Sequence, residues 1–220
     1  MTPLVIFDCD GVLVDSERLV NATEAAYFTR LGAPMDTQNA RELFKGKTVA
    51  QVAADVESIA GRPLPPDWAY EWAMAVAVGL AKELRATAGI RDVLGALRAS
   101  GRAFCLASQS SLPRIALSLH ITQLEEFFAG AVFSASMVER PKPAPDLFLF
   151  AAENMGAAPR DCTVVEDSPS GVLAARAAGM RVLGYAADED PARLADAGAE
   201  VFHHMNELPA LLEIVAAANH

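Results

Sequence analysis

The sequence predicts an α/β fold with an inserted helical domain, on three observations. Residues 4–8 form an opening strand that is continuous in Leu, Val, Ile and Phe rather than alternating, which is typical of a parallel sheet covered on both faces. From Gly89 onward, strand patterns alternate with helix patterns, which indicates βαβ units. Between them, residues 15–86 carry no strand pattern. The prediction is a Rossmann-like parallel sheet core, residues 1–14 and 87–220, with an all-helical (four-helix) insert, residues 15–86.

The insert is divided into helices by capping residues and by helix-breaking glycines and prolines. Asp15 or Ser16 can cap the first helix, because short polar side chains accept hydrogen bonds from exposed N–H groups there. Thr48 and Asp67 can cap the third and fourth helices in the same way. The four predicted helices cover residues 16–31, 37–44, 48–60 and 68–86.

The rest of the chain is predicted to complete the sheet and its covering helices. The predicted strands after the insert cover residues 103–107, 131–133, 162–165, 181–185 and 200–202. The predicted helices cover residues 91–100, 112–119, 145–155 and 170–178, with a final helix from residue 207.

The composition limits which binding partners and which cellular compartment are expected for this protein. The net charge of −10 argues against nucleic acid, because binding to its phosphates needs clustered Lys and Arg. Cys9, Cys105 and Cys162 are odd in number and form no Cys-x-x-Cys pair, which argues against a zinc site or a disulfide framework. The N-terminus lacks the pattern of a signal peptide, and the longest apolar run, residues 72–81, is too short to span a bilayer. We expect a cytoplasmic protein without a membrane partner; the sequence does not indicate its oligomeric state.

The first predicted strand ends in two carboxylates. Asp8 and Asp10 are two residues apart, so on an extended chain they point to the same side and repel each other. A divalent cation relieves such repulsion, and Mg²⁺ is commonly held by one or two carboxylates. Gly11 allows the backbone to approach a ligand closely. The alternative is an ordinary turn, since Asp and Gly are common turn residues.

Three more strand ends or loops carry polar residues that suit a phosphate site. Ser108 and Gln109 end the second strand, where a hydroxyl and free N–H groups suit an oxyanion, although these residues can also simply cap the next helix. Lys142 lies between prolines, which stiffen the backbone around it, and an incidental surface lysine is the alternative. Glu166 and Asp167 end another apolar strand. Ligands of parallel sheets bind at such strand ends.

These motifs, in this order, resemble the four motifs of the haloacid dehalogenase (HAD) superfamily. The matching segments are Asp8-x-Asp10-Gly11, Ser108, Lys142 in a Lys-Pro-x-Pro context, and Glu166-Asp167 followed by Gly171 and Ala178-Gly179-Met180. The resemblance covers the whole chain, and the insert resembles the four-helix cap of the β-phosphoglucomutase-like branch.

The resemblance implies a Mg²⁺-dependent phosphatase, a phosphoric monoester hydrolase that acts through an aspartyl-phosphate. Asp8 would be the nucleophile and Asp10 the general acid and base. Asp8, Asp167 and the backbone carbonyl of Asp10 would hold Mg²⁺, with Glu166 acting through water. Ser108 and Lys142 would bind the phosphoryl oxygens, and Lys142 would also balance the charge of Asp8.

Three functions are alternatives to a phosphatase. Haloalkanoic acid dehalogenases lack the second aspartate, whereas Asp10 is present here. A β-phosphoglucomutase holds a second phosphate with a histidine and an arginine of the cap, and this chain has Val20 and Val49 there, with Ser111 where a phosphate-binding lysine follows the second motif. Hydrolysis is therefore favoured over a mutase. A catalytically idle binding protein is the third alternative.

The loop between the second and third insert helices is the expected substrate contact. Lys45 and Lys47 flank Gly46 there, and Lys45 and Gly46 are predicted to reach the substrate. Two lysines would suit hydroxyl or carboxylate groups. The predicted partner is a small phosphorylated metabolite, namely a sugar, sugar-acid or polyol phosphate.

Overall fold

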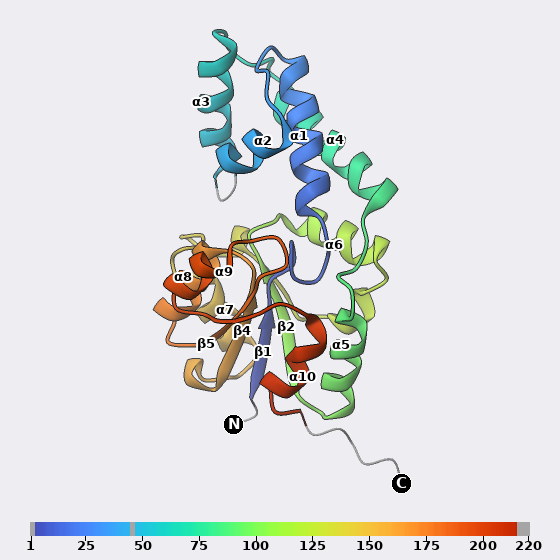
Figure 1. Ribbon diagram of the computed structural model, residues 1–220, viewed down its shortest axis with the longest axis vertical. Coiled ribbons are helices and arrows are strands. Elements are labelled where there is room, and N and C mark those ends of the chain that lie inside the picture. Colours follow the sequence, from blue (N-terminus) through green and yellow to red (C-terminus); the bar gives the residue numbers. More distant parts are fainter. Residues whose placement is uncertain (1–2, 45–46, 215–220) are drawn as a thin grey trace. The chain divides into compact units, whose positions relative to one another are not determined.

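The computed structural model describes residues 3–44 and 47–214, and these fall into two compact units (Figure 1). The core unit comprises the described residues up to Val14 and from Arg85 onward. The insert unit is Asp15–Leu84. Each unit has its own arrangement of elements.

A parallel sheet of six strands forms the centre of the described core unit. The strand order is β3-β2-β1-β4-β5-β6, and every neighbouring pair is parallel. Phe7 of β1 is level with Leu106 of β2 and Val165 of β4, so these three strands end side by side. The order reverses between β1 and β4, which is where doubly wound sheets bind their ligands. The predicted fold class is confirmed. The strands are β1 (Leu4–Phe7), β2 (Ala103–Ser108), β3 (Val132–Ser134), β4 (Cys162–Glu166), β5 (Arg181–Tyr185) and β6 (Glu200–Phe202).

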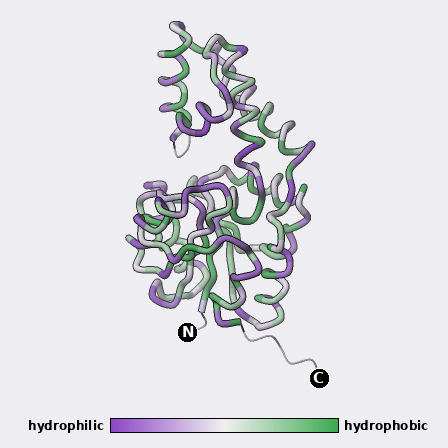
Figure 2. Tube along the Cα trace, viewed as in Figure 1, coloured by the Kyte–Doolittle hydropathy of each residue, from purple (hydrophilic) through white to green (hydrophobic). Residues whose placement is uncertain are grey.

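Helices cover both faces of this sheet, which explains the continuous hydrophobicity of its strands (Figures 1 and 2). Leu4 and Ile6 face the helices α7 (Asp146–Asn154) and α8 (Pro169–Ala177) and share one buried cluster with them. Phe7 points to the opposite face, where its ring meets the rings of Phe104 and Phe128 edge-on. α5 (Ile90–Ala99) packs against β2, and α6 (Leu112–Ile121) follows that strand.

The insert unit has a hydrophobic core of its own. Phe28 is fully buried there, and its ring lies 5.6 Å from that of Trp72. Trp72 in turn stacks on Trp68, with ring centroids 5.7 Å apart. Thr48 caps the third helix in a capping box with Gln51, which confirms the predicted cap. The helices are α1 (Glu17–Arg30), α2 (Thr37–Phe44), α3 (Val49–Ala60) and α4 (Trp68–Glu83).

The predicted end of the last insert helix was wrong by three residues. α4 ends at Glu83, because Ala86 forms an antiparallel bridge with Val14 instead. The neighbouring Thr87 N–H donates to the Leu13 carbonyl at 3.0 Å. The chain therefore leaves the core and returns to it at adjacent points.

Other predictions of helices and caps also need correction. Ser16 and Asp67 occupy N-cap positions, but neither side chain makes a capping hydrogen bond. The helix α9 (Pro191–Asp196) was not predicted, although Asp190 caps it and Pro191 opens it, both typical start signals. The final helix, α10 (Leu208–Leu211), is only four residues long. Nowhere in residues 3–44 and 47–214 is a helix both long and apolar enough to cross a membrane.

Candidate active site

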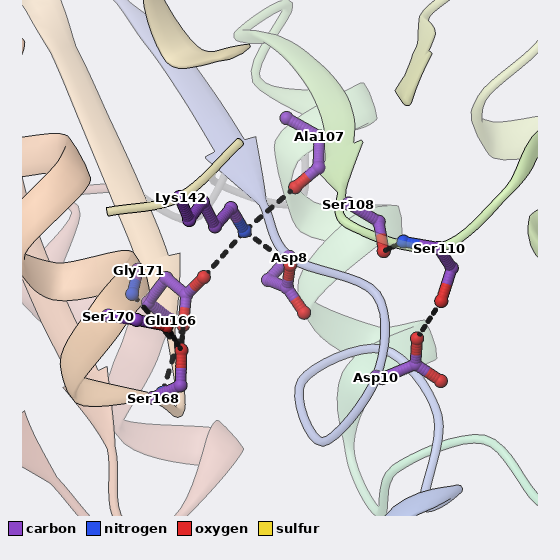
Figure 3. Close-up of polar contacts among 10 residues, drawn as sticks. All are labelled: Asp8, Asp10, Ala107, Ser108, Ser110, Lys142, Glu166, Ser168, Ser170 and Gly171. Carbon is purple, nitrogen blue, oxygen red and sulfur yellow. Dashed lines mark hydrogen bonds and ion pairs between the residues drawn. The ribbon is translucent and has the colours of Figure 1, made fainter. Parts of the chain in front are cut away.

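The predicted polar residues gather at the carboxyl ends of β1, β2 and β4 (Figure 3). Asp8 follows β1 directly, and its N–H donates to the Val165 carbonyl at 3.0 Å. Ser108 and Glu166 are the last residues of β2 and β4. Because these strands are neighbours and end at the same level, residues far apart in the sequence meet here.

Lys142 lies at the centre of this group. Its Nζ donates to Asp8 Oδ1 at 2.6 Å, to Glu166 Oε1 at 2.6 Å and to the Ala107 carbonyl at 3.2 Å. The Nζ also lies 4.7 Å from the centroid of the Phe148 ring, on the side of the sheet covered by α7. The lysine is 5% exposed, so it is a buried cation with two anionic partners rather than a surface residue.

Burial and neighbouring charges determine the protonation states of Asp8 and Lys142. Burial raises the pKa of Asp8 to about 7; Lys142 opposes this rise, and the nearby Glu166 charge adds to it. Burial alone would lower the pKa of Lys142, but the charges of Asp8 and Glu166 and their hydrogen bonds raise it instead. Lys142 therefore remains a cation, and Asp8 is a carboxyl group that another positive charge would ionise fully.

Glu166 holds Lys142 from the other side. Its second oxygen, Oε2, accepts hydrogen bonds from the N–H and the hydroxyl of Ser168, both at 2.9 Å. The Ser168 hydroxyl also accepts from the Gly171 N–H at 3.1 Å and so caps α8. A Cβ at Gly171 would lie 1.8 Å from Glu166 Oε1, so only glycine leaves room for this carboxylate. These contacts favour a role for Glu166 in holding Lys142 rather than in binding a cation directly.

The donor set beside Asp8 fits a hard cation. Asp167 is buried and lies against Gly11, where an added Cβ would come within 2.3 Å of Asp167 Oδ2. Gly11 has a φ of +84°, which also favours glycine. Within the described residues, no three His, Cys, Asp or Glu side chains form a metal-binding group. The carboxylates of Asp8 and Asp167 and the backbone carbonyl of Asp10 still suit Mg²⁺, since this ion usually keeps several waters or substrate oxygens.

Asp10 is held by two residues that the sequence reasoning did not single out as its partners. Its Oδ2 accepts from the Ser110 hydroxyl at 2.6 Å, and its Oδ1 accepts from Arg114 Nη2 at 3.0 Å. Arg114 lies in the first turn of α6, the helix that follows β2. A usable signal was present: a serine just past a strand end, followed four residues later by a cation in the first helical turn, places two donors at the same edge of the sheet.

The remaining predicted residues divide into those placed in the site and those outside it. Ser108 is buried, and its hydroxyl accepts from the Ser110 N–H at 3.1 Å. Gln109 is exposed to solvent. Lys45 and Gly46 lie outside the described residues. Lys47 forms an ion pair with Asp55 of the same unit, with Nζ and Oδ2 2.6 Å apart.

Comparison with known proteins gives consistent matches over most of the chain. A family model for haloacid dehalogenase-like hydrolases matches residues 2–179. The 6-phosphogluconate phosphatase of Escherichia coli is 29% identical over 94% of this chain and 93% of that protein. Hexitol phosphatase A of Escherichia coli is 30% identical over 86% of this chain and 85% of its own length. The crystal structure of a HAD family hydrolase from Deinococcus radiodurans, with bound phosphate and sodium, is 30% identical with a TM-score of 0.81, covering 100% of this chain and 99% of that one.

Proposed function

The chain belongs to the haloacid dehalogenase-like hydrolases and is a phosphoric monoester hydrolase; on that premise, we propose that it is a Mg²⁺-dependent phosphatase of a small phosphorylated metabolite. The observation that carries this proposal is the buried Lys142 between Asp8 and Glu166. Such a lysine keeps a carboxylate and an incoming phosphoryl group, both negative, compatible in one site.

The proposed reaction proceeds in two steps on Asp8. The Asp8 carboxylate attacks phosphorus and forms an aspartyl-phosphate, while the bond from phosphorus to the leaving oxygen breaks and Asp10 gives that oxygen a proton. Water then attacks phosphorus, Asp10 takes a proton from it, and inorganic phosphate leaves. The Asp8 carboxylate and the protonated Asp10 are thereby restored.

The other residues act by charge and position. Lys142 and Ser108 bind the phosphoryl oxygens, and Glu166 with Ser168 keeps the Lys142 ammonium aimed at Asp8. Asp8, Asp167 and the Asp10 carbonyl would hold Mg²⁺. When bound, the metal supplies positive charge that offsets the repulsion between the carboxylate and the phosphoryl group.

The proposed substrate is a sugar, sugar-acid or polyol phosphate, selected by the insert unit acting as a cap. Two relatives named for 6-phosphogluconate and hexitol phosphates support this class. Val20 is buried in the insert and Val49 is exposed, and neither can bind a second phosphate as the cap histidine and arginine of a mutase would. Lys47 is paired with Asp55, so Lys45 is the one loop lysine proposed to meet a carboxylate on the substrate.

A product analysis tests this proposal. The protein is incubated with Mg²⁺ and 6-phosphogluconate, fructose 1-phosphate or β-glucose 1-phosphate, and both inorganic phosphate and phosphosugar isomers are followed. We expect stoichiometric phosphate release from at least one substrate, its loss in Asp8→Asn, and no change in Asp196→Asn, an exposed aspartate of α9. Conversion of β-glucose 1-phosphate to glucose 6-phosphate with little phosphate released would instead indicate a mutase.

A further inference from the structure

Asp10 has a partner for each of its two carboxylate oxygens. Ser110 donates to Oδ2 and Arg114 donates to Oδ1, at 2.6 and 3.0 Å. We infer that Ser110 and Arg114 form a clamp that positions the Asp10 carboxyl group for proton transfer to the leaving oxygen. This inference rests on the proposed function, because it assigns Asp10 the role of general acid and base. Ser110 and Arg114 are then positioning residues for the reaction.

The backbone alone does not fix the Asp10 side chain. The loop after β1 is held by its own hydrogen bonds, from the Gly11 N–H to the Val14 carbonyl at 2.9 Å and from the Leu13 N–H to the Cys9 carbonyl at 2.9 Å. The carboxyl group of an aspartate still rotates about two side-chain bonds. Two donors, one on each oxygen, select one orientation of this group.

The clamp is itself anchored to two neighbouring strand ends. The Ser110 N–H donates to the Ser108 hydroxyl at 3.1 Å, and the Ser110 carbonyl accepts from the Ser134 hydroxyl at 2.8 Å (Figure 3 shows Ser108, Ser110 and Asp10). Ser134 ends β3 and is fully buried. The peptide that carries the phosphoryl-binding Ser108 therefore also carries a donor to Asp10. This connection fixes the acid relative to the phosphoryl group.

The chemistry of the three side chains separates their roles. The Arg114 guanidinium stays charged at all working pH values, so it orients Asp10 but exchanges no proton. The proton moves from Asp10 to the leaving oxygen in the first step and from water to Asp10 in the second, and neither Ser110 nor Arg114 is consumed. A misdirected acid slows the first step most when the leaving oxygen is basic, because such an oxygen departs only with a proton.

Leaving-group dependence is therefore the test. Single-turnover phenol release with enzyme in excess and Mg²⁺ present is measured for aryl phosphates ranging from 4-nitrophenyl phosphate to unsubstituted phenyl phosphate. For Arg114→Gln we expect a loss of about tenfold on phenyl phosphate, part of the 10²–10⁴-fold typical of general acid catalysis, and little change on 4-nitrophenyl phosphate. Ser110→Ala should show the same pattern, Asp10→Asn a steeper one, and Arg114→Lys a partial recovery.

Arg181→Gln is the matched control. Arg181 forms a two-pronged ion pair with Glu200, at 3.1 and 2.6 Å, at the start of β5 and so at the opposite end of this strand from the site. This variant should keep the wild-type leaving-group dependence. If Arg114→Gln does not fold by circular dichroism, Ser110→Ala decides the case.

The possible failures are distinct. If Arg114→Gln and Ser110→Ala each lost the same factor on every aryl phosphate of the series, or lost nothing, the clamp would be overturned. The phosphatase proposal would remain intact. Unchanged turnover in Asp8→Asn would overturn the phosphatase mechanism, and the clamp inference with it.

Discussion

Lys142 is the residue on which the charge balance of the site depends. It is buried between two buried carboxylates, each 2.6 Å from its Nζ, so the three groups together carry at most one net negative charge. Taking ions out of water is costly, and their mutual attraction offsets that cost only while all partners are present. Removal of the lysine would leave Asp8 and Glu166 facing each other without a cation.

Lys142→Met should therefore destabilise the protein as well as inactivate it. Breaking a buried ion pair from one side typically costs about 3–5 kcal/mol, and we expect a loss of that order in the free energy of unfolding at pH 8. The loss should shrink toward pH 5, because burial raises the pKa of Asp8 and this carboxyl group can take up a proton there. Urea unfolding at both pH values measures it, with the exposed Lys82→Met as control. A similar small change in both variants would contradict the prediction.

The raised pKa of Asp8 predicts how Mg²⁺ binding depends on pH. With a pKa of about 7, Asp8 is mostly protonated below pH 7 in the metal-free protein, and a cation must displace that proton. The apparent affinity for Mg²⁺ should therefore rise as pH increases from 6 to 8, by up to about tenfold for each pH unit below the pKa. Calorimetric titration at several pH values measures this dependence. It should be much weaker in Asp8→Asn, and an equal slope in both proteins would contradict the assignment.

At the scale of secondary-structure elements, α8 is arranged around a carboxylate. Gly171 lies inside this helix, where glycine normally lowers stability relative to alanine. Its position is explained by Glu166, whose carboxylate fills the space that a Cβ would occupy. Gly171 thus lowers the helix propensity of α8 but leaves room for Glu166, the partner of Lys142.

Gly171→Ala and Gly95→Ala should have opposite effects. Gly95 lies inside α5, is exposed, and has no heavy atom within 4 Å of an added Cβ, so its replacement should stabilise the protein by about 0.5–1 kcal/mol. Gly171→Ala should destabilise by about 1–3 kcal/mol through overpacking and should lower activity, because Glu166 must move away from Lys142. Thermal unfolding and phosphate release measure both effects. A stabilised and fully active Gly171→Ala would show that Glu166 can move without consequence.

Elements that carry a strong local pattern were predicted, and contacts that depend on strand order were not. β1 is an apolar run followed by an acid, and β4 is a mostly apolar run that ends in one, so their existence and the nearby Asp8 and Glu166 followed from the sequence. The partnership of Arg114 with Asp10 joins residues 104 positions apart. It exists only because β2 lies beside β1, an adjacency that no local pattern specifies. The short α9 was missed because six residues give too little periodicity.

At the scale of the whole molecule, one helical unit is inserted into one loop of the core. Its two connections meet, since Val14 and Ala86 form an antiparallel bridge beside the hydrogen bond from Thr87 to Leu13. The insert packs around its own buried residues, including Phe28 and Val56. The core strands likewise have a separate hydrophobic cluster.

Replacing residues 15–84 with a short Gly/Ser linker should leave a folded core unit with altered selectivity. The bridge between Val14 and Ala86 places the ends to be joined close together. We expect kcat/KM for the preferred metabolite to fall at least about tenfold more than that for 4-nitrophenyl phosphate, because a small activated ester needs little remote binding energy. Circular dichroism checks the fold and steady-state kinetics measure the ratio. Equal losses on both substrates would mean that the insert does not select the substrate.

The meeting of the two connections also bears on how the chain reaches its folded state. β1 must pair with β2, which lies roughly a hundred residues later in the chain, and closing a long loop costs entropy that grows with the logarithm of its length. If the insert folds first, its joined ends shorten that loop about threefold and lower the closure cost by about 1 kcal/mol. We therefore expect pulse-labelled hydrogen exchange during refolding to protect amides of α1 and α4 before those of β1. The folded insert would then hold the chain segments that carry β1 and β2 close together and so favour their pairing.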